Sequence, residues 1–127
     1  MSQGFNAQRG LILISAALEG PSRIVRPRLA VDTGASLTSI AERYLILAGY
    51  DPSQAPRRVR VTTPSGVVWM PQLPVTRIKA LGQERVNFLV LSHALPPTAT
   101  FDGLLGLDVV RGQTLTIDFR GGQISLT

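Results

Sequence analysis

Asp32 stands in a sequence context that can give a carboxylate a chemical role. It follows the apolar residues Ala30 and Val31 and precedes Thr33-Gly34-Ala35. Apolar residues that run into Asp-Thr-Gly predict a buried strand ending in a tight turn, with the carboxylate at its end. Two such carboxylates in contact can take a proton from water and give one to a carbonyl oxygen. Asp-Thr-Gly alone is more often an ordinary turn, but with a second carboxylate beside it Asp32 could perform general acid–base chemistry.

This Asp-Thr-Gly turn occurs once in the chain. None of the other acidic residues is followed by Thr-Gly or Ser-Gly; they are Glu19, Glu42, Asp51, Glu84, Asp102, Asp108 and Asp118. A chain of 127 residues is long enough to bury one core and too short to build two lobes. We therefore expect a single domain over residues 1–127 and a second carboxylate that comes from another polypeptide.

Composition limits the other classes of function. The net charge of +5 comes from arginines scattered along the chain, with one cluster at Arg57-Arg58-x-Arg60, and only 6% of residues are aromatic. Scattered charge with few stacking aromatics argues against a nucleic-acid surface. The chain has no Cys and a single imidazole, at His93, which excludes disulfides and thiolate or histidine-rich metal sites. We expect no cofactor and no metal.

A β-hairpin is predicted to deliver Asp32 to its turn. The segments Leu11–Ala17 and Arg23–Val31 flank Glu19-Gly20-Pro21, which has turn-forming residues. The apolar run Leu11–Leu18 lacks a small-residue cleavage pattern and therefore predicts a strand, not a signal peptide. No run approaches membrane-spanning length. We expect a cytoplasmic protein, and any membrane anchor would lie outside these residues.

The rest of the chain predicts short strands with one helix. Ser39-x-x-Glu42 is a capping-box pattern, and the apolar residues after it have helical spacing up to Gly49. Three further hairpins are predicted, with strands Val59–Thr63 and Val67–Met70, Val75–Leu81 and Val86–Leu91 around Gly82-Gln83, and Thr114–Phe119 and Gln123–Leu126. The 12 glycines and nine prolines suit many tight turns, so the expected class is mostly β.

Three motifs, in this order and spacing, resemble those of the retropepsin-like aspartic proteases over about residues 10–126. They are the turn at Asp32, the tip Thr63-Pro64-Ser65-Gly66 and the segment Asp102–Asp108. The resemblance implies a catalytic Asp32. It implies a substrate-binding flap with its tip at Thr63, Pro64, Ser65 and Gly66. It also implies that a structural motif passes behind the active-site turn, made of Gly103, Leu104, Leu105 and Gly106.

The same resemblance gives three neighbours of Asp32 a supporting role. The Thr33 hydroxyl is expected to reach the turn of the opposite subunit. Gly34 permits a backbone approach that a Cβ would obstruct, and its amide can donate to the Asp32 carboxylate. Ala35 stands where pepsin-like lobes have Ser, which removes one donor to the ionised carboxylates. We therefore hypothesise a mildly acidic pH optimum.

The expected molecule is a retropepsin-like half-barrel, closed or partly open, with one or two short helices. It would act as a homodimer that cleaves an extended peptide or protein substrate under two flaps, with Gln123–Thr127 as a candidate interface strand. One alternative is a catalytically inactive module of this fold that binds peptides or partners. The other is a basic nucleic-acid binder, whose affinity would fall steeply with salt.

Four other residues are expected to have a structural role and not a catalytic one. We expect the single Trp69 to pack in the core. Asp108 is expected to cap a short helix that runs through Val110. His93 is interpreted as a loop residue without a catalytic role, and Asp118 as a solvent-facing strand residue.

Overall fold

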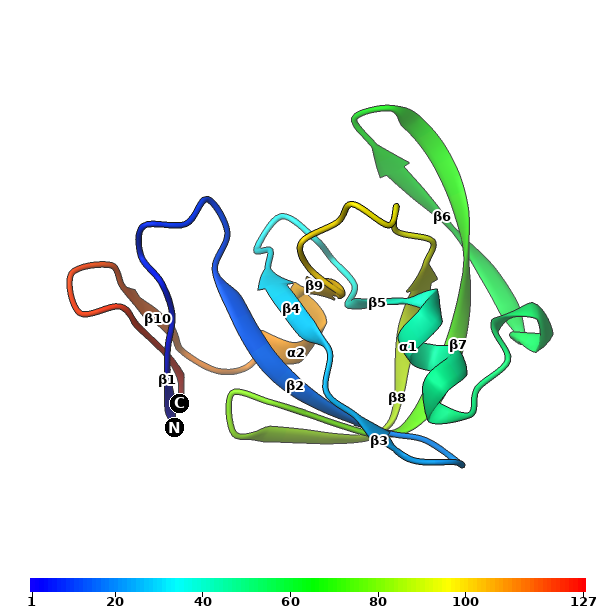
Figure 1. Cartoon of the computed structure of the whole chain (residues 1–127), viewed down its shortest axis with the longest axis horizontal. Helices are drawn as coiled ribbons and strands as arrows, with labels where there is room; N and C mark the ends of the chain where they lie inside the picture. The colour runs from blue at the N-terminus through cyan, green and yellow to red at the C-terminus, as the bar shows by residue number, and fades with distance from the viewer.

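The computed structural model describes all residues, 1–127, and consists mostly of strands (Figure 1). The strands are β1 (Ser2–Gly4), β2 (Leu13–Glu19), β3 (Ile24–Val25), β4 (Arg28–Val31), β5 (Ser39–Ala41), β6 (Arg57–Thr63), β7 (Gly66–Ala80), β8 (Gln83–His93), β9 (Gly103–Leu105), β10 (Leu115–Asp118) and β11 (Gln123–Leu126). Two helices, α1 (Glu42–Ala48) and α2 (Leu107–Val110), and a 3-10 turn, η1 (Pro52–Gln54), complete the structure.

Eight strands form one sheet that closes on itself. Their order is β3-β2-β4-β9-β5-β8-β7-β6, and β2 pairs in addition with β7. This extra pairing joins six strands, from β2 to β7 in that order, into a ring. The β4–β9 and β5–β8 pairs are parallel, and the other pairs are antiparallel. Strand β6 lies outside the ring, so the β6–β7 hairpin projects from the barrel (Figure 1).

A single apolar cluster forms the core. Its fully buried members come from strands all around the ring and from α1, among them Leu18, Leu29, Ile40, Leu45 and Val90. Alternation of apolar and polar residues in the antiparallel strands explains how one face of each strand reaches this core. The hydrophobic effect therefore fixes the register of the strands, because a shift by one residue would expose the buried face.

The first and last strands lie side by side in a separate sheet of order β1-β11-β10. Ser2 is opposite Ser125, and the two chain ends meet at the lower left of Figure 1. Because β11 pairs with β1 on one edge and with β10 on the other, neither of its edges is free. In this structure the expected interface strand Gln123–Thr127 therefore has no free edge for a partner strand, and the edge strands of its sheet are β1 and β10.

Each predicted hairpin is present, but the bounds of some strands and the position of one turn differ from the prediction. Strand β7 runs unbroken through Pro71 and Pro74, where the sequence suggested two separate strands. The β7–β8 turn is Leu81-Gly82, one residue earlier than predicted, because Ala80 pairs with Gln83. Both turn residues have positive φ, 52° and 77°, and Leu81 is nevertheless 2% exposed. Burial of the Leu81 side chain offsets the cost of its left-handed backbone.

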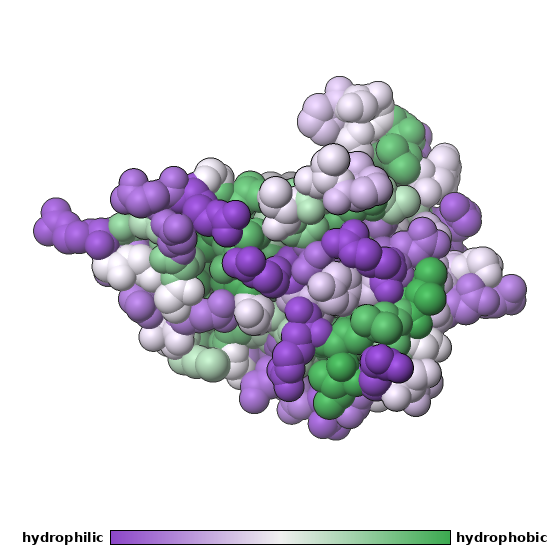
Figure 2. Space-filling model, viewed as in Figure 1, coloured by the Kyte–Doolittle hydropathy of each residue, from purple (hydrophilic) through white to green (hydrophobic).

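Helix α1 forms, but its predicted capping box does not. The helix begins at Glu42 after Ala41, without a side-chain hydrogen bond at its cap, and ends at Gly49 in the left-handed conformation. Ser39 instead lies in strand β5. Figure 2 shows an apolar patch at the lower right, where Figure 1 places α1 and β3; both elements expose large apolar side chains, Ile46 and Leu47 on α1 and Ile24 on β3.

Candidate active site

Asp32 lies directly after β4, at the start of a tight turn. Its backbone amide donates to the carbonyl of Leu105 at 3.0 Å, and its carbonyl accepts from the amide of Ala35 at 3.1 Å. The amide of Gly34 donates to Oδ1 of Asp32 at 2.9 Å, which is the hydrogen bond that the sequence suggested. A Cβ on Gly34 would lie 3.2 Å from the same oxygen. The turn therefore holds the carboxylate through its own backbone.

Strand β9 and the glycine after it pass closely behind this turn. β9 pairs in parallel with β4, so that Val31 is opposite Leu105. The amide of Leu107 donates to the carbonyl of Ala35 at 2.8 Å. A Cβ on Gly106 would lie 2.7 Å from the carbonyl carbon of Leu37, a contact that real structures do not contain. Gly106 is therefore required by close packing of two backbone segments.

The polar side chain of Thr38 joins the same two segments. Its hydroxyl accepts from the amide of Gly106 at 3.0 Å and donates to Oδ1 of Asp108 at 2.6 Å. The Thr38 amide donates to Oδ2 of Asp108 at 2.9 Å. The expectation that Asp108 caps α2 is wrong, because the N-cap of α2 is Gly106 and has no side-chain cap. Asp108 instead ties α2 to the segment that follows Asp32.

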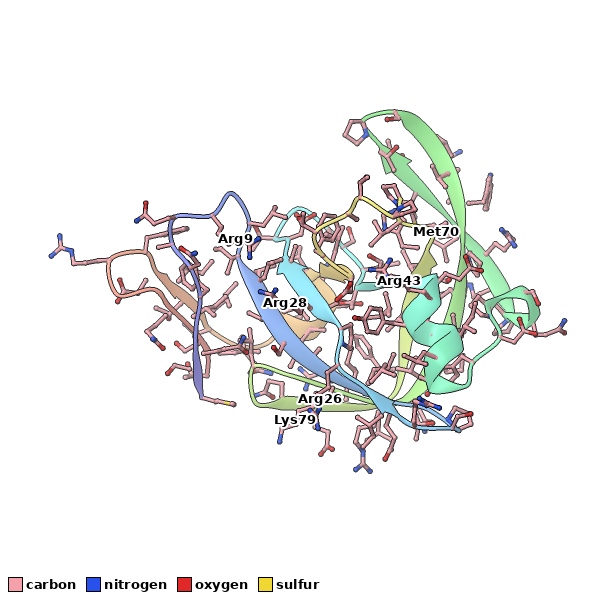
Figure 3. The ribbon with its side chains drawn as sticks, in the orientation of Figure 1. Arg9, Arg26, Arg28, Arg43, Met70 and Lys79 are labelled. Carbon is pink, nitrogen blue, oxygen red and sulfur yellow. The ribbon has the colours of Figure 1, made fainter.

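A cleft of about 550 Å³ lies between the Asp32 turn and the β6–β7 hairpin. We call residues 57–72, which pair as β6 and the first part of β7, the flap. The flap stands above the body of the molecule in Figure 2, and Met70 lies at its base in Figure 3. The lining residues are Asp32, Gly34, Ala35, Ser36, Leu37, Ser39, Val59, Arg60, Val61, Thr62, Thr63, Pro64, Met70, Leu91, His93 and Leu104.

Hydrogen bonds at the flap tip give it a defined shape. The Thr63 hydroxyl donates to the carbonyl of Gly66 at 2.9 Å and accepts from the amide of Ser65 at 3.3 Å. Gly66 has φ of 123°, a conformation that side chains with a Cβ rarely adopt. Thr63 pairs with Gly66 and leaves Pro64-Ser65 as a two-residue turn.

Trp69 is not in the core, contrary to expectation. It is 57% exposed and pairs with Arg60, one position before the buried Met70. Successive strand residues point to opposite faces, and Met70 lines the cleft, so Trp69 lies on the outer face of the flap. The exposure of Trp69 is decided by the pairing register of β6 with β7. This register cannot be inferred from the presence of a single Trp in the sequence.

The structure brings together part of the predicted site. Asp32, Gly34 and Ala35 line the cleft with Leu104 and with two residues of the flap tip, Thr63 and Pro64. The other predicted residues do not line it; they are Thr33, Ser65, Gly66, Gly103, Leu105 and Gly106. Gly103 has a structural reason to be glycine, since its φ is 155° and a Cβ would lie 2.1 Å from the carbonyl oxygen of Ser39.

Ten lining residues were not predicted as site residues, and His93 and Ser39 are two of them. His93 is the last residue of β8, not a loop residue, and Ser39 lies on the neighbouring strand β5. Burial lowers the pKa of His93 from its ordinary value of 6.5, because the imidazolium form loses hydration. The parallel pairing of β5 with β8 brings both residues to the cleft. These strands are far apart in the sequence, so short-range sequence patterns do not predict their pairing. The structure contains no group of His, Cys, Asp and Glu side chains that could hold a metal ion.

Comparisons with known proteins agree with this geometry. The sequence matches the family described as aspartyl protease over residues 14–109. The structure is similar to a crystal structure of a retropepsin-like aspartic protease from Rickettsia conorii, with a TM-score of 0.74 and 20% identity over 99% of this chain and 88% of that chain. A search of curated proteins gave no match.

A viral structure is also similar. The solution structure of the Simian Foamy Virus (mac) protease has a TM-score of 0.51 and 17% identity, over 77% of this chain and 90% of that chain. The two likenesses show a mostly-β, retropepsin-like fold, as the sequence predicted. No helix in the structure has the length and apolar character needed to cross a membrane.

Proposed function

Because this chain belongs to the aspartyl protease family, over residues 14–109, we propose that it is an aspartic endopeptidase. One observation carries the proposal: the Asp32 carboxylate lines a cleft roofed by a flap, and the Gly34 amide fixes one of its oxygens. A cleft of about 550 Å³ has room for several side chains of an extended peptide. Asp32 is the proposed catalytic residue, and the flap is the proposed cover of the substrate.

The reaction needs a second carboxylate, and we propose that a second copy of the chain supplies it. Asp32 is the only acidic residue in the cleft lining. In a two-fold dimer the same turn of each chain faces its copy across the axis, so two Asp32 side chains can meet. Thr33 is exposed beside Asp32, a position from which its hydroxyl can contact the partner's turn.

Such a pair can perform both proton transfers of peptide hydrolysis. Two carboxylates in contact resist joint ionisation, so they hold one proton between them over a range of acidic pH. The ionised oxygen takes a proton from water, which attacks the peptide carbonyl carbon, and the protonated oxygen gives its proton to the carbonyl oxygen. Proton transfer to the nitrogen then accompanies cleavage of the carbon–nitrogen bond. The flap would exclude bulk water during these steps.

Asp32→Asn tests this proposal directly. Wild type and variant are incubated with a diverse peptide library at about pH 3 to 7.5, and products are read by mass spectrometry. We expect cleavage by the wild type alone, because Asn keeps the shape of Asp and loses its charge. Asp51→Asn is the matched control, since Asp51 lies outside the cleft and the Asn oxygen can still accept from the Ser53 amide.

A dimer that leaves every peptide intact would contradict the proposal. That result would favour the inactive peptide-binding module. Cleavage that persists in Asp32→Asn would also contradict it, because the activity would then come from other residues or from a contaminating protease.

A further inference from the structure

Two residues that line the cleft each carry a buried polar atom that has no hydrogen-bond partner. Only three buried side-chain polar atoms in the structure lack a partner, namely Ser39 Oγ, His93 Nδ1 and Gln113 Oε1. Two of the three belong to residues that line the Asp32 cleft. Buried polar groups are nearly always hydrogen-bonded, so two orphaned groups in one cleft require an explanation.

Strand pairing places both residues on the cleft floor. Ser39 is opposite Leu91 in the parallel β5–β8 pair and opposite Leu104 in the antiparallel β5–β9 pair. His93 follows Leu91 by two residues and therefore shares its face of β8. Diagonal neighbours of this kind have backbones about 7–8 Å apart, within reach of one inserted side chain. Ser39 is 3% exposed and lines the cleft, so this residue forms part of the cleft floor.

The Ser39 hydroxyl and the His93 imidazole have apolar neighbours, and no charged side chain lies beside them on the cleft floor. Leu91 and Leu104 flank Ser39 on the neighbouring strands, and Met70 lines the cleft at the base of the flap. The lining contains two charged residues, Asp32 and Arg60, and Arg60 is opposite Trp69 in the β6–β7 pair, so its side chain points to the outer face of the flap. Burial lowers the pKa of His93 and so favours the neutral imidazole, which presents one nitrogen donor and one acceptor.

We propose that Ser39 and His93 form a subsite that selects a substrate side chain ending in a carboxamide, Gln or Asn. The inference rests on the proposed peptidase function and adds its specificity. A carboxamide carries both a donor and an acceptor, so it can satisfy a hydroxyl and either tautomer of imidazole. A carboxylate offers acceptors only and would lose hydration against a neutral pair, while an apolar side chain would leave both groups unpaired.

Matched peptides measure this selection. A peptide that the wild type cleaves is remade with Gln, Glu or Met at each position in turn, since these three side chains have similar size. We expect kcat/KM at one position to favour Gln over Met and Glu by about tenfold. Ser39→Ala and His93→Leu should each lower the Gln-to-Met ratio by about threefold to tenfold, the value of one hydrogen bond.

Ser92→Ala is the matched control. Ser92 is buried like Ser39, but it points to the opposite face of β8 and does not line the cleft. Its Gln-to-Met ratio should equal that of the wild type. An unchanged ratio in both Ser39→Ala and His93→Leu would overturn the subsite and would indicate that water satisfies the two groups.

Two measurements do not depend on hydrolysis. The Asp32→Asn variant should bind the Gln peptide more tightly than the Met peptide, and the added change Ser39→Ala should remove this preference. If the wild type cleaves nothing and this binding preference is found, the subsite stands and the peptidase function fails. If neither binding nor cleavage is found, both proposals fail.

The second measurement is the melting temperature of Ser39→Ala. Removal of an unpaired buried hydroxyl should leave this temperature equal to that of the wild type or raise it. A clear fall would show that the hydroxyl already has a partner and would overturn the subsite. The same melting curves establish that His93→Leu is folded.

Discussion

Thr38 and Asp108, 70 positions apart in the sequence, are joined by two hydrogen bonds. The shorter one, at 2.6 Å, runs from the Thr38 hydroxyl to Oδ1 of Asp108, and this hydroxyl also accepts from the Gly106 amide. Thr38 is fully buried. The pair fastens the segment after Asp32 to helix α2 and so supports the carboxylate from behind.

Thr38→Val should lower the free energy of unfolding by about 1 to 3 kcal/mol. Valine keeps the shape of threonine but leaves the Gly106 amide and one oxygen of Asp108 without a partner. Urea denaturation measures the change, with Thr38→Ser as the control that retains the hydroxyl. Equal stability of the Val and Ser variants would contradict the structural role of this hydroxyl.

Gly106→Ala should destabilise the protein by about 2 to 3 kcal/mol, because the new Cβ overlaps the backbone of Leu37. Gly10→Ala is the control, since a Cβ there meets nothing within 4 Å. Thermal melting compares the two. If both variants melted together with the wild type, the backbone segments behind the turn would have to be farther apart than in this structure.

Ala35→Ser should move the pH of maximum cleavage to lower values. The added hydroxyl lies in the cleft next to the active-site turn, where it can donate to the ionised carboxylates of the proposed pair. Because the hydroxyl stabilises the ionised carboxylates, they remain ionised at a more acidic pH. The test is a pH profile of kcat/KM for one peptide. A profile that superimposes on that of the wild type would argue against the missing donor as the cause of a mildly acidic optimum.

His93 should make the protein less stable as the solution becomes more acidic. Its pKa is lowered in the folded state, so the unfolded chain binds the proton more readily. This histidine therefore costs no stability above its ordinary pKa of 6.5, and stability falls as pH drops from there through the lower folded value. His93→Gln should show a shallower loss between about pH 8 and 5.5 in denaturation experiments. Parallel curves for the two proteins would contradict burial of the imidazole.

Dilution should reduce peptidase activity more than in proportion to protein concentration. If each active site needs Asp32 from two chains, the concentration of sites falls with the square of the chain concentration well below the dissociation constant of the dimer. Initial rates over a dilution series measure this dependence. Strict proportionality, with the protein shown to be monomeric by sedimentation, would rule out a shared site.

Local patterns predicted the elements around Asp32 correctly. The turn signals at Gly20 and at Pro64 mark hairpins that are present, and Asp32 follows the predicted strand. Hairpins depend on residues adjacent in sequence, so local turn chemistry is enough to identify them. The Asp-Thr-Gly motif likewise identified its own internal hydrogen bond, from Gly34 to Asp32.

Errors arose where distant strands decide the outcome. Ser39 has the spacing of a helix cap to Glu42, but pairing with β8 and β9 holds it in a strand. Asp108 stands at the start of a helix, but the buried Thr38 offers it two donors. Trp is a residue type that is usually buried, but the pairing register of β6 with β7 places Trp69 on the outer face of the flap. In each case a long-range contact overrides a correct local preference.

The pairing of β1 with β11 also makes the chain suitable for circular permutation. Because Ser2 lies opposite Ser125, a short peptide could join the present termini without disturbing either strand. The loop 95–100 lies between β8 and β9, outside both sheets, and is a suitable place for the opening. A circular permutant that begins there would retain every strand pair of the barrel and would present its tags and fusion partners on the loop instead of the terminal sheet.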